Sequence, residues 1–306
     1  MGKIKICLFN KLSIESDGRA IPKVETRKAE ELLGYLLVYR DSPHPRERLA
    51  DVLWKGETTS EQSKGYLRKA LWQLQSLLEQ YSVQDILIIE GEWLQINKQF
   101  DYWLDVAILE DAFKNTQGIK GSDLDKKRFQ VIQLAAECYK GDLLEGWYQD
   151  WCTYERERLQ HLYLSILNKL MDYCEANQKY EDGLIYGEMI LRYDHARENT
   201  HRRLMNLYYL SGDRTAAIRQ YERCTSALRE ELDVEPADST RSLKELIAKD
   251  QLKYQPQSIR VDGNKKDSLH RLFRHLMAVQ KDLGNIQAQL TREIQAIQKA
   301  LEEKQL

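Results

Sequence analysis

The sequence predicts a mainly α-helical chain: a winged helix-turn-helix, then a tetratricopeptide-like helical repeat domain, then a C-terminal coiled-coil-like helix. Short alternating strands and amphipathic helices fill the first hundred residues. Helix then follows helix, and an apolar heptad pattern marks the end of the chain. We expect the winged helix over 1–105, the repeat domain over 106–250, a linker over 251–267 and the last helix over 268–306.

The winged helix is predicted from the order of its elements. Apolar and polar residues alternate near Ile4–Leu8 and again at Leu12 and Ile14, as in half-buried strands. Thr26 can cap a first helix, a second is expected at about 46–54, and a third at about 61–80 carries a leucine stripe at 67, 71, 74 and 78. A hairpin around the turn Glu90-Gly91-Glu92 closes the domain.

The repeat domain is predicted from an internal period. Two similar segments, which start at Tyr180 and Arg214, stand 34 residues apart, and each opens an amphipathic helix. This is the period of tetratricopeptide repeats. The small residues Gly183 and Ala217 take equivalent places, where paired helices approach closely.

The tail is predicted to dimerise. Its heptad pattern runs unbroken through Leu276, Leu283, Ile286 and Leu290. A long exposed apolar strip is rare in monomers, so a homodimer is the favoured state. Packing of this helix on its own chain is the alternative, and the orientation of a dimer stays open.

Composition limits the function. The 306 residues are 42% hydrophobic and 31% charged, with a net charge of −2. The net charges are −1 over 1–106, −5 over 107–250 and +4 over 251–306, so electrostatics alone does not indicate nucleic-acid binding. Five scattered cysteines, no signal peptide and no apolar stretch able to cross a bilayer predict a cytoplasmic protein without membrane contact.

Motifs of catalysis are missing from the sequence. It has no phosphate-binding glycine loop, no Gly-x-Ser-x-Gly, no His-Glu-x-x-His and no Cys-x-x-Cys. The six histidines do not pair at metal-ligand spacing. We therefore expect a protein that binds rather than catalyses, with no metal and no cofactor.

Several motifs carry a family resemblance. Residues 45–54 read Pro-Arg-Glu-Arg-Leu-Ala-Asp-Val-Leu-Trp, and residues 67–74 read Leu-Arg-Lys-Ala-Leu-Trp-Gln-Leu. Residues 139–144 read Tyr-Lys-Gly-Asp-Leu-Leu, and residues 151–156 read Trp-Cys-Thr-Tyr-Glu-Arg. Over about 1–250 the chain resembles the Streptomyces antibiotic regulatory protein family of bacterial transcription activators. That family joins an OmpR-like winged helix to a tetratricopeptide "bacterial transcriptional activator domain".

The resemblance implies that the third helix enters the major groove of DNA while the wing touches the backbone. Lys64, Arg68 and Lys69 are then the main positive contacts, and Gln62 or Gln73 could read an adenine. RNA polymerase or another transcription factor is the implied protein partner.

A second interpretation stays open, in which the winged helix has lost tight DNA binding. The helix carries fewer arginines than is usual in the family, and Trp72 falls on the side that would face the groove. The protein would then be a signalling receptor or adaptor that binds a nucleotide second messenger, such as a cyclic dinucleotide, and controls a partner transcription factor. The candidate partner or ligand contacts are Trp72, Arg46, Arg48, Arg158, Arg202 and Arg203.

Overall fold

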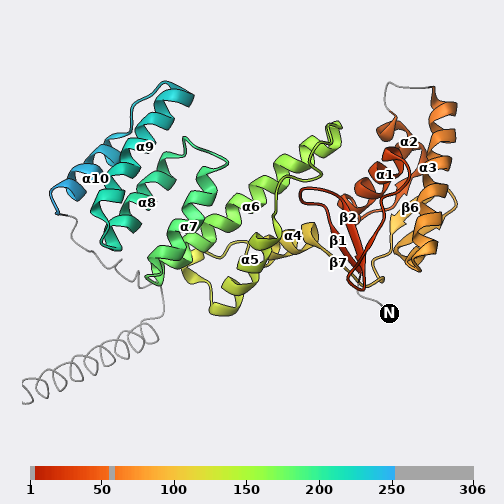
Figure 1. Ribbon diagram of the computed structural model, residues 1–306, viewed down its shortest axis with the longest axis horizontal. Helices are drawn as coiled ribbons and strands as arrows, with labels where there is room; N and C mark the ends of the chain where they lie inside the picture. Colours follow the sequence, from red (N-terminus) through yellow and green to blue (C-terminus); the bar gives the residue numbers. More distant parts are fainter. Residues whose placement is uncertain (1–3, 55–58, 252–306) are drawn as a thin grey trace, which may run out of the picture. The chain divides into compact units, whose positions relative to one another are not determined.

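The computed structural model describes residues 4–54 and 59–251, which form one compact unit (Figure 1). Within these ranges the chain folds into two small sheets and ten α-helices, so the predicted fold class, a winged helix followed by a helical domain, is confirmed. The predicted last helix, with Leu276, Leu283, Ile286 and Leu290, lies outside the described residues, and so does the predicted linker apart from Gln251.

The first sheet has four strands in the order β3-β2-β1-β7. The strands β1 (Ile4–Cys7), β2 (Ser13–Ser16) and β3 (Arg19–Ile21) form an antiparallel meander, and β7 (Tyr102–Leu104) lies parallel to β1. The turn between β2 and β3 is Asp17-Gly18, a turn-forming pair in the sequence, and Gly18 has a φ of +75° that suits glycine. The pattern did not predict β7, because three residues are too few to show an alternation.

Three helices and a second sheet complete the winged helix. The helices are α1 (Arg27–Val38), α2 (Arg46–Leu53) and α3 (Ser60–Gln80), and the hairpin strands are β5 (Leu87–Glu90) and β6 (Trp93–Ile96). The short strand β4 (His44–Pro45) pairs with β6, so the sheet order is β4-β6-β5. The predicted leucine stripe of α3 is buried at all four positions, which confirms which side of α3 faces the core.

The rest of the described chain is helical. Its helices are α4 (Asp105–Asn115), α5 (Lys126–Cys138), α6 (Asp150–Ala176), α7 (Tyr180–Leu191), α8 (Glu198–Leu210), α9 (Arg214–Leu232) and α10 (Asp238–Ala248). The predicted repeat segments begin α7 and α9. A Cβ atom built on Gly183 would lie 3.0 Å from Leu207 of α8, and Ala217 is fully buried. Both small residues therefore lie where helices pack closely together. None of the helices in the described ranges is long and apolar enough to span a membrane.

A buried carboxylate joins the winged helix to the helical domain. Asp105, the first residue of α4, accepts hydrogen bonds from the backbone N–H groups of Leu8, Phe9 and Val106 at 2.8 to 3.0 Å. Burial raises the pKa of Asp105, while these N–H donors act to lower it. The carboxylate therefore ties the end of β1 to the start of α4.

The loop before α6 also connects the winged helix to the helical domain. Asn10 N–H donates to Asp142 O, Leu144 N–H donates to Leu8 O, and Phe9 and Leu143 form an isolated antiparallel bridge. The Arg156 guanidinium, nearly two turns inside α6, holds the other side of the loop by donating to the carbonyl oxygens of Leu143, Leu144 and Trp147.

Side chains of α1 pack directly on this loop and on α6. A Cβ atom on Gly34 would lie 3.0 Å from the Trp147 ring, so the absence of a side chain there lets the loop approach α1. The rings of Tyr35 and Trp151 meet edge-on, with centroids 5.2 Å apart. The winged helix and the helical domain thus share one core across residues that are more than a hundred positions apart in sequence.

Candidate nucleic-acid interface

Helix α3 begins at a capping box. Thr59 accepts from the backbone at Gln62, and the Gln62 side chain accepts in turn from the Thr59 N–H at 3.3 Å. Gln62 is exposed, yet its carbonyl oxygen is already used by the helix end. Gln62, which was predicted to read a base, therefore helps to cap the start of α3 in this structure.

The exposed side of α3 is centred on an aromatic residue. Trp72 is 65% exposed, and Arg68 and Lys69 lie one turn before it on the same open side. Tyr66 is 48% exposed and its ring lies near that of Trp54. This side thus presents two cations around a large apolar ring, and the predicted exposure of Trp72 is observed.

Lys64 is not a free cation. Its ammonium donates to the Glu47 carboxylate of α2 at 2.9 Å, and both side chains are open to solvent. This hydrogen bond raises the pKa of Lys64, and the charges of Asp51 and Glu92 act in the same direction. Three carboxylates therefore surround the first predicted phosphate contact.

Gln73 lies on a different side from the one predicted. The sequence argument placed it on the open side of α3, but it is buried against the start of α1. The Thr26 hydroxyl donates to Gln73 Oε1 at 2.7 Å, and Gln73 Nε2 donates to Glu25 at 3.2 Å. Gln73 lies next to the leucine stripe of α3. Its side chain is buried because Glu25 and Thr26, which precede α1, supply its hydrogen-bond partners.

The hairpin that corresponds to the wing has an acidic tip. Glu90 ends β5, and Gly91 and Glu92 form the turn to β6, with Gly91 at a φ of +56°. Arg46 N–H donates to Glu92 O at 2.8 Å, which ties this tip to the start of α2. Phosphates repel carboxylates, so the tip opposes a close approach of the DNA backbone. The sequence showed these residues only as a turn.

Three of the arginines suggested as ligand contacts serve internal ion pairs. Arg158 of α6 bonds Glu110 and Glu155, and Glu110 also accepts from Arg40. Arg203 of α8 bonds Asp172 and Glu175 of α6 at 2.6 and 2.8 Å. Arg202 pairs with Glu198 at 3.8 Å and donates to Asn199, Ser239 and Thr240.

These networks connect neighbouring helices of the helical domain. Arg46 is half-buried and Arg48 is exposed, both on α2. The arginine pairs therefore do not converge on one ligand site.

No group of His, Cys, Asp and Glu among the described residues could hold a metal ion.

Comparison with known proteins identifies the helical domain. Residues 104–248 match the family model of the bacterial transcriptional activator domain. A solved structure of Mycobacterium tuberculosis EmbR, in complex with a low-affinity phosphopeptide, matches with a TM-score of 0.64 at 18% identity. The match covers 82% of this chain and 66% of that one. No curated protein matches the chain.

These matches define the class of protein. Residues 104–248 belong to the bacterial transcriptional activator domain family, and the described fold is similar to that of EmbR. The resemblance to the Streptomyces antibiotic regulatory protein family is confirmed, and α4 to α10 form its bacterial transcriptional activator domain.

Proposed function

We propose that this regulator binds DNA through α3 and that its activator domain contacts RNA polymerase or another transcription factor in the cytoplasm. The observation that carries the proposal is the helix-turn-helix itself. Helix α2 packs against α3, the leucine stripe of α3 is buried, and Arg68 and Lys69 remain exposed on the opposite side. A helix presented in this way fits the major groove.

The charges around α3 favour weak, salt-sensitive binding. Arg68 and Lys69 are open to solvent, but Lys64 must leave Glu47 before it can reach a phosphate. The acidic wing tip adds repulsion at the edge of the same surface. Sequence-independent attraction is therefore small, and recognition depends on the few side chains that enter the groove.

Replacing Lys64, Arg68 and Lys69 together by glutamine is expected to weaken binding of the full-length protein to its operator duplex at least about tenfold. Each phosphate contact that is lost lowers the slope of log affinity against log salt by about 0.9, so three lost contacts lower it by about 2.7. Fluorescence anisotropy at several salt concentrations measures both quantities.

The matched control removes three charges elsewhere. Lys120, Lys126 and Lys127 are exposed lysines around the start of α5, and their replacement by glutamine changes the net charge equally. If the control and the α3 variant bind duplex equally well, DNA does not dock on α3.

Replacing Glu47 and Glu92 by glutamine is expected to have the opposite effect. Loss of these two carboxylates frees Lys64 and reduces repulsion at the wing, so affinity should rise about threefold to tenfold and the salt slope should steepen. The same anisotropy titration measures the change. An unchanged affinity would mean that Lys64 and the wing lie away from the DNA. Replacing the exposed residues Glu222 and Glu230 of α9 by glutamine is the control.

The second candidate is an adaptor that acts on another transcription factor without binding DNA tightly. Trp72 at the centre of the open side of α3, and Trp93 at 48% exposure on the hairpin, favour it, because tryptophan is enriched at protein interfaces. The two titrations separate the candidates. If neither the wild type nor the Glu47/Glu92 variant binds duplex at low salt, DNA binding through α3 is contradicted and the adaptor is the remaining candidate.

A further inference from the structure

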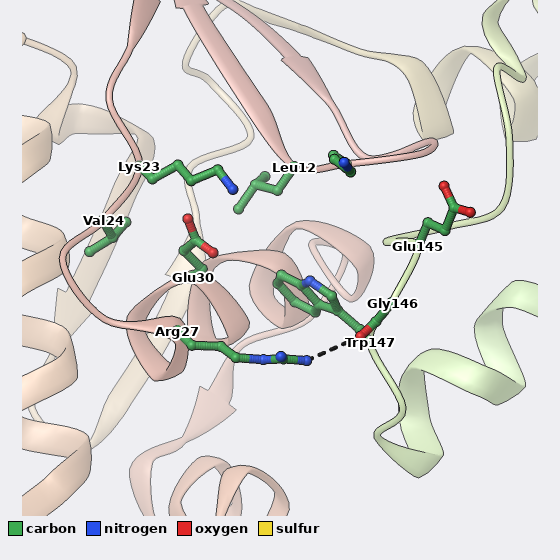
Figure 2. Close-up of a pocket in the computed structure, with 9 residues that line it drawn as sticks. Leu12, Lys23, Val24, Arg27, Glu30, Glu145, Gly146 and Trp147 are labelled. Carbon is green, nitrogen blue, oxygen red and sulfur yellow. Dashed lines mark hydrogen bonds between the residues drawn. The ribbon is translucent and has the colours of Figure 1, made fainter.

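A cavity of about 340 Å³ opens where the winged helix meets the activator domain (Figure 2). Its lining comes from three separate segments: the loop between β1 and β2, the start of α1 with the loop before it, and the loop before α6. A ligand that fills it contacts both domains at once.

Cations outnumber carboxylates in this cavity. Lys11, Lys23 and Arg27 line it, against Glu30 and Glu145. Arg27 is held in place because its guanidinium donates to Gly146 O at 3.2 Å and pairs with Glu31. Among the described residues, neither Lys11 nor Lys23 has an ion-pair partner, so both ammonium groups remain available.

The start of α1 adds to the positive potential. The Thr26 hydroxyl donates to Gln73 and does not cap the first turn of α1. The positive end of the helix dipole therefore has no side-chain acceptor, and it lies beside Lys23 and Arg27. Burial raises the pKa of Glu30, while Lys23 and Arg27 act to lower it.

The remaining lining is apolar or accepts hydrogen bonds. Leu12, Val24 and Trp147 provide apolar surface, and Figure 2 shows Trp147 and Leu12 facing the same space. Glu30 and Glu145 offer carboxylate oxygens to N–H donors. A matching ligand is a net anion with a flat apolar part and N–H groups.

We propose that this cavity binds a nucleoside monophosphate. Lys11 and Lys23 hold the phosphate, Arg27, which stays paired with Glu31, adds positive charge beside it, and the base lies against Leu12 and Trp147. The N–H groups of the base donate to the carboxylates. The volume lies near the lower end of small-molecule sites, which span about 300–1,000 Å³, so it holds one mononucleotide.

Binding would strengthen the contact between winged helix and activator domain, because both supply ligand contacts. The proposal does not depend on whether α3 binds DNA. It also places the ligand away from the arginine pairs of α6 and α8, whose guanidinium groups are already engaged in ion pairs.

Calorimetric titration of the full-length protein with GMP, AMP, guanosine and inorganic phosphate tests the proposal. At least one nucleotide should bind more than about tenfold tighter than guanosine and than phosphate, and it should raise the melting temperature in proportion to saturation. Replacing Lys11 and Lys23 together by glutamine should weaken that nucleotide at least about tenfold, because hydrogen bonds to charged groups are lost.

The control for this variant is the replacement of Lys120 and Lys127 by glutamine, which should leave nucleotide binding unchanged. A second variant, Glu145→Gln, should weaken the nucleotide by about threefold or more while phosphate binding does not fall.

Three results would overturn the proposal. The first is no nucleotide binding at millimolar concentration. The second is phosphate binding as tight as nucleotide binding, which leaves only an anion site. The third is a Lys11/Lys23 variant that binds nucleotide as the wild type does.

Discussion

Replacing Asp105 by alanine is expected to destabilise the protein by at least about 3 kcal/mol. The variant leaves the buried N–H groups of Leu8, Phe9 and Val106 without their acceptor, and each orphaned donor costs about 1–3 kcal/mol. Asp105 is 2% exposed, so water cannot readily replace the carboxylate. Urea unfolding followed by circular dichroism measures the free energy of unfolding.

Two further variants make this result specific. Asp105→Asn keeps one acceptor oxygen and nearly the same shape, so it should lose less stability than Asp105→Ala. Asp101→Ala removes an exposed carboxylate four residues earlier and should stay within about 0.5 kcal/mol of the wild type. Equal stability of Asp105→Ala and Asp101→Ala would show that the carboxylate does not hold the joint between β1 and α4.

Replacing Arg156 by methionine is expected to loosen the loop of residues 143–147. One guanidinium serves three backbone carbonyl oxygens of this loop, at 3.0 to 3.2 Å. Methionine fills similar space but donates no hydrogen bond. The loss of three charge-assisted bonds should cost about 3–5 kcal/mol, in the range seen when a buried charged partner is removed.

Amide hydrogen exchange locates this effect. Exchange should accelerate at Asn10, Leu144 and Glu145, whose N–H groups bridge the winged helix and the loop. Exchange in α9 should not change. Arg219→Met, at an exposed position of α9, is the matched control and should leave the loop protected. If Arg156→Met behaves like this control, the loop is held by Gly34 and the aromatic contacts instead.

Both variants concern the contact between the two domains. Asp105, the loop of residues 143–147 and the Tyr35–Trp151 contact connect α1 with α4 and α6. A ligand or partner that changes the activator domain therefore has a direct structural route to the helix that packs behind α3. The cavity lined by Lys23 and Trp147 lies on this route.

The local elements could be predicted from the sequence, because each is specified by residues close to one another. The leucines at 67, 71, 74 and 78 recur at helical spacing, so the buried side of α3 followed directly from the pattern. The turns at Gly18 and Gly91 were visible as glycines between alternating strands. The 34-residue period predicted where α7 and α9 begin, and the family motifs predicted the domain confirmed over 104–248.

The functional surface was predicted less well. Lys64 was expected to meet DNA, but Glu47 of another helix and Glu92 of the wing surround it. Gln73 was expected on the open side of α3, but Glu25 and Thr26 bind it from a segment 47 positions away. Arg203 of α8 was considered a ligand contact, but it pairs with acidic residues of α6, two helices earlier.

What the sequence by itself determined was therefore the three helices and the hairpin of the first domain, the starts of α7 and α9, and the family of the second domain. Only the tertiary structure decided which charges are free, which are paired, and how the two domains join. The physical reason is the sequence distance between interacting residues. Helical periodicity and turn chemistry act over a few residues, whereas Lys64, Gln73 and Asp105 have hydrogen-bond partners 17 to 97 positions away. Those partners are brought together by packing, which the spacing of residues along one element does not encode.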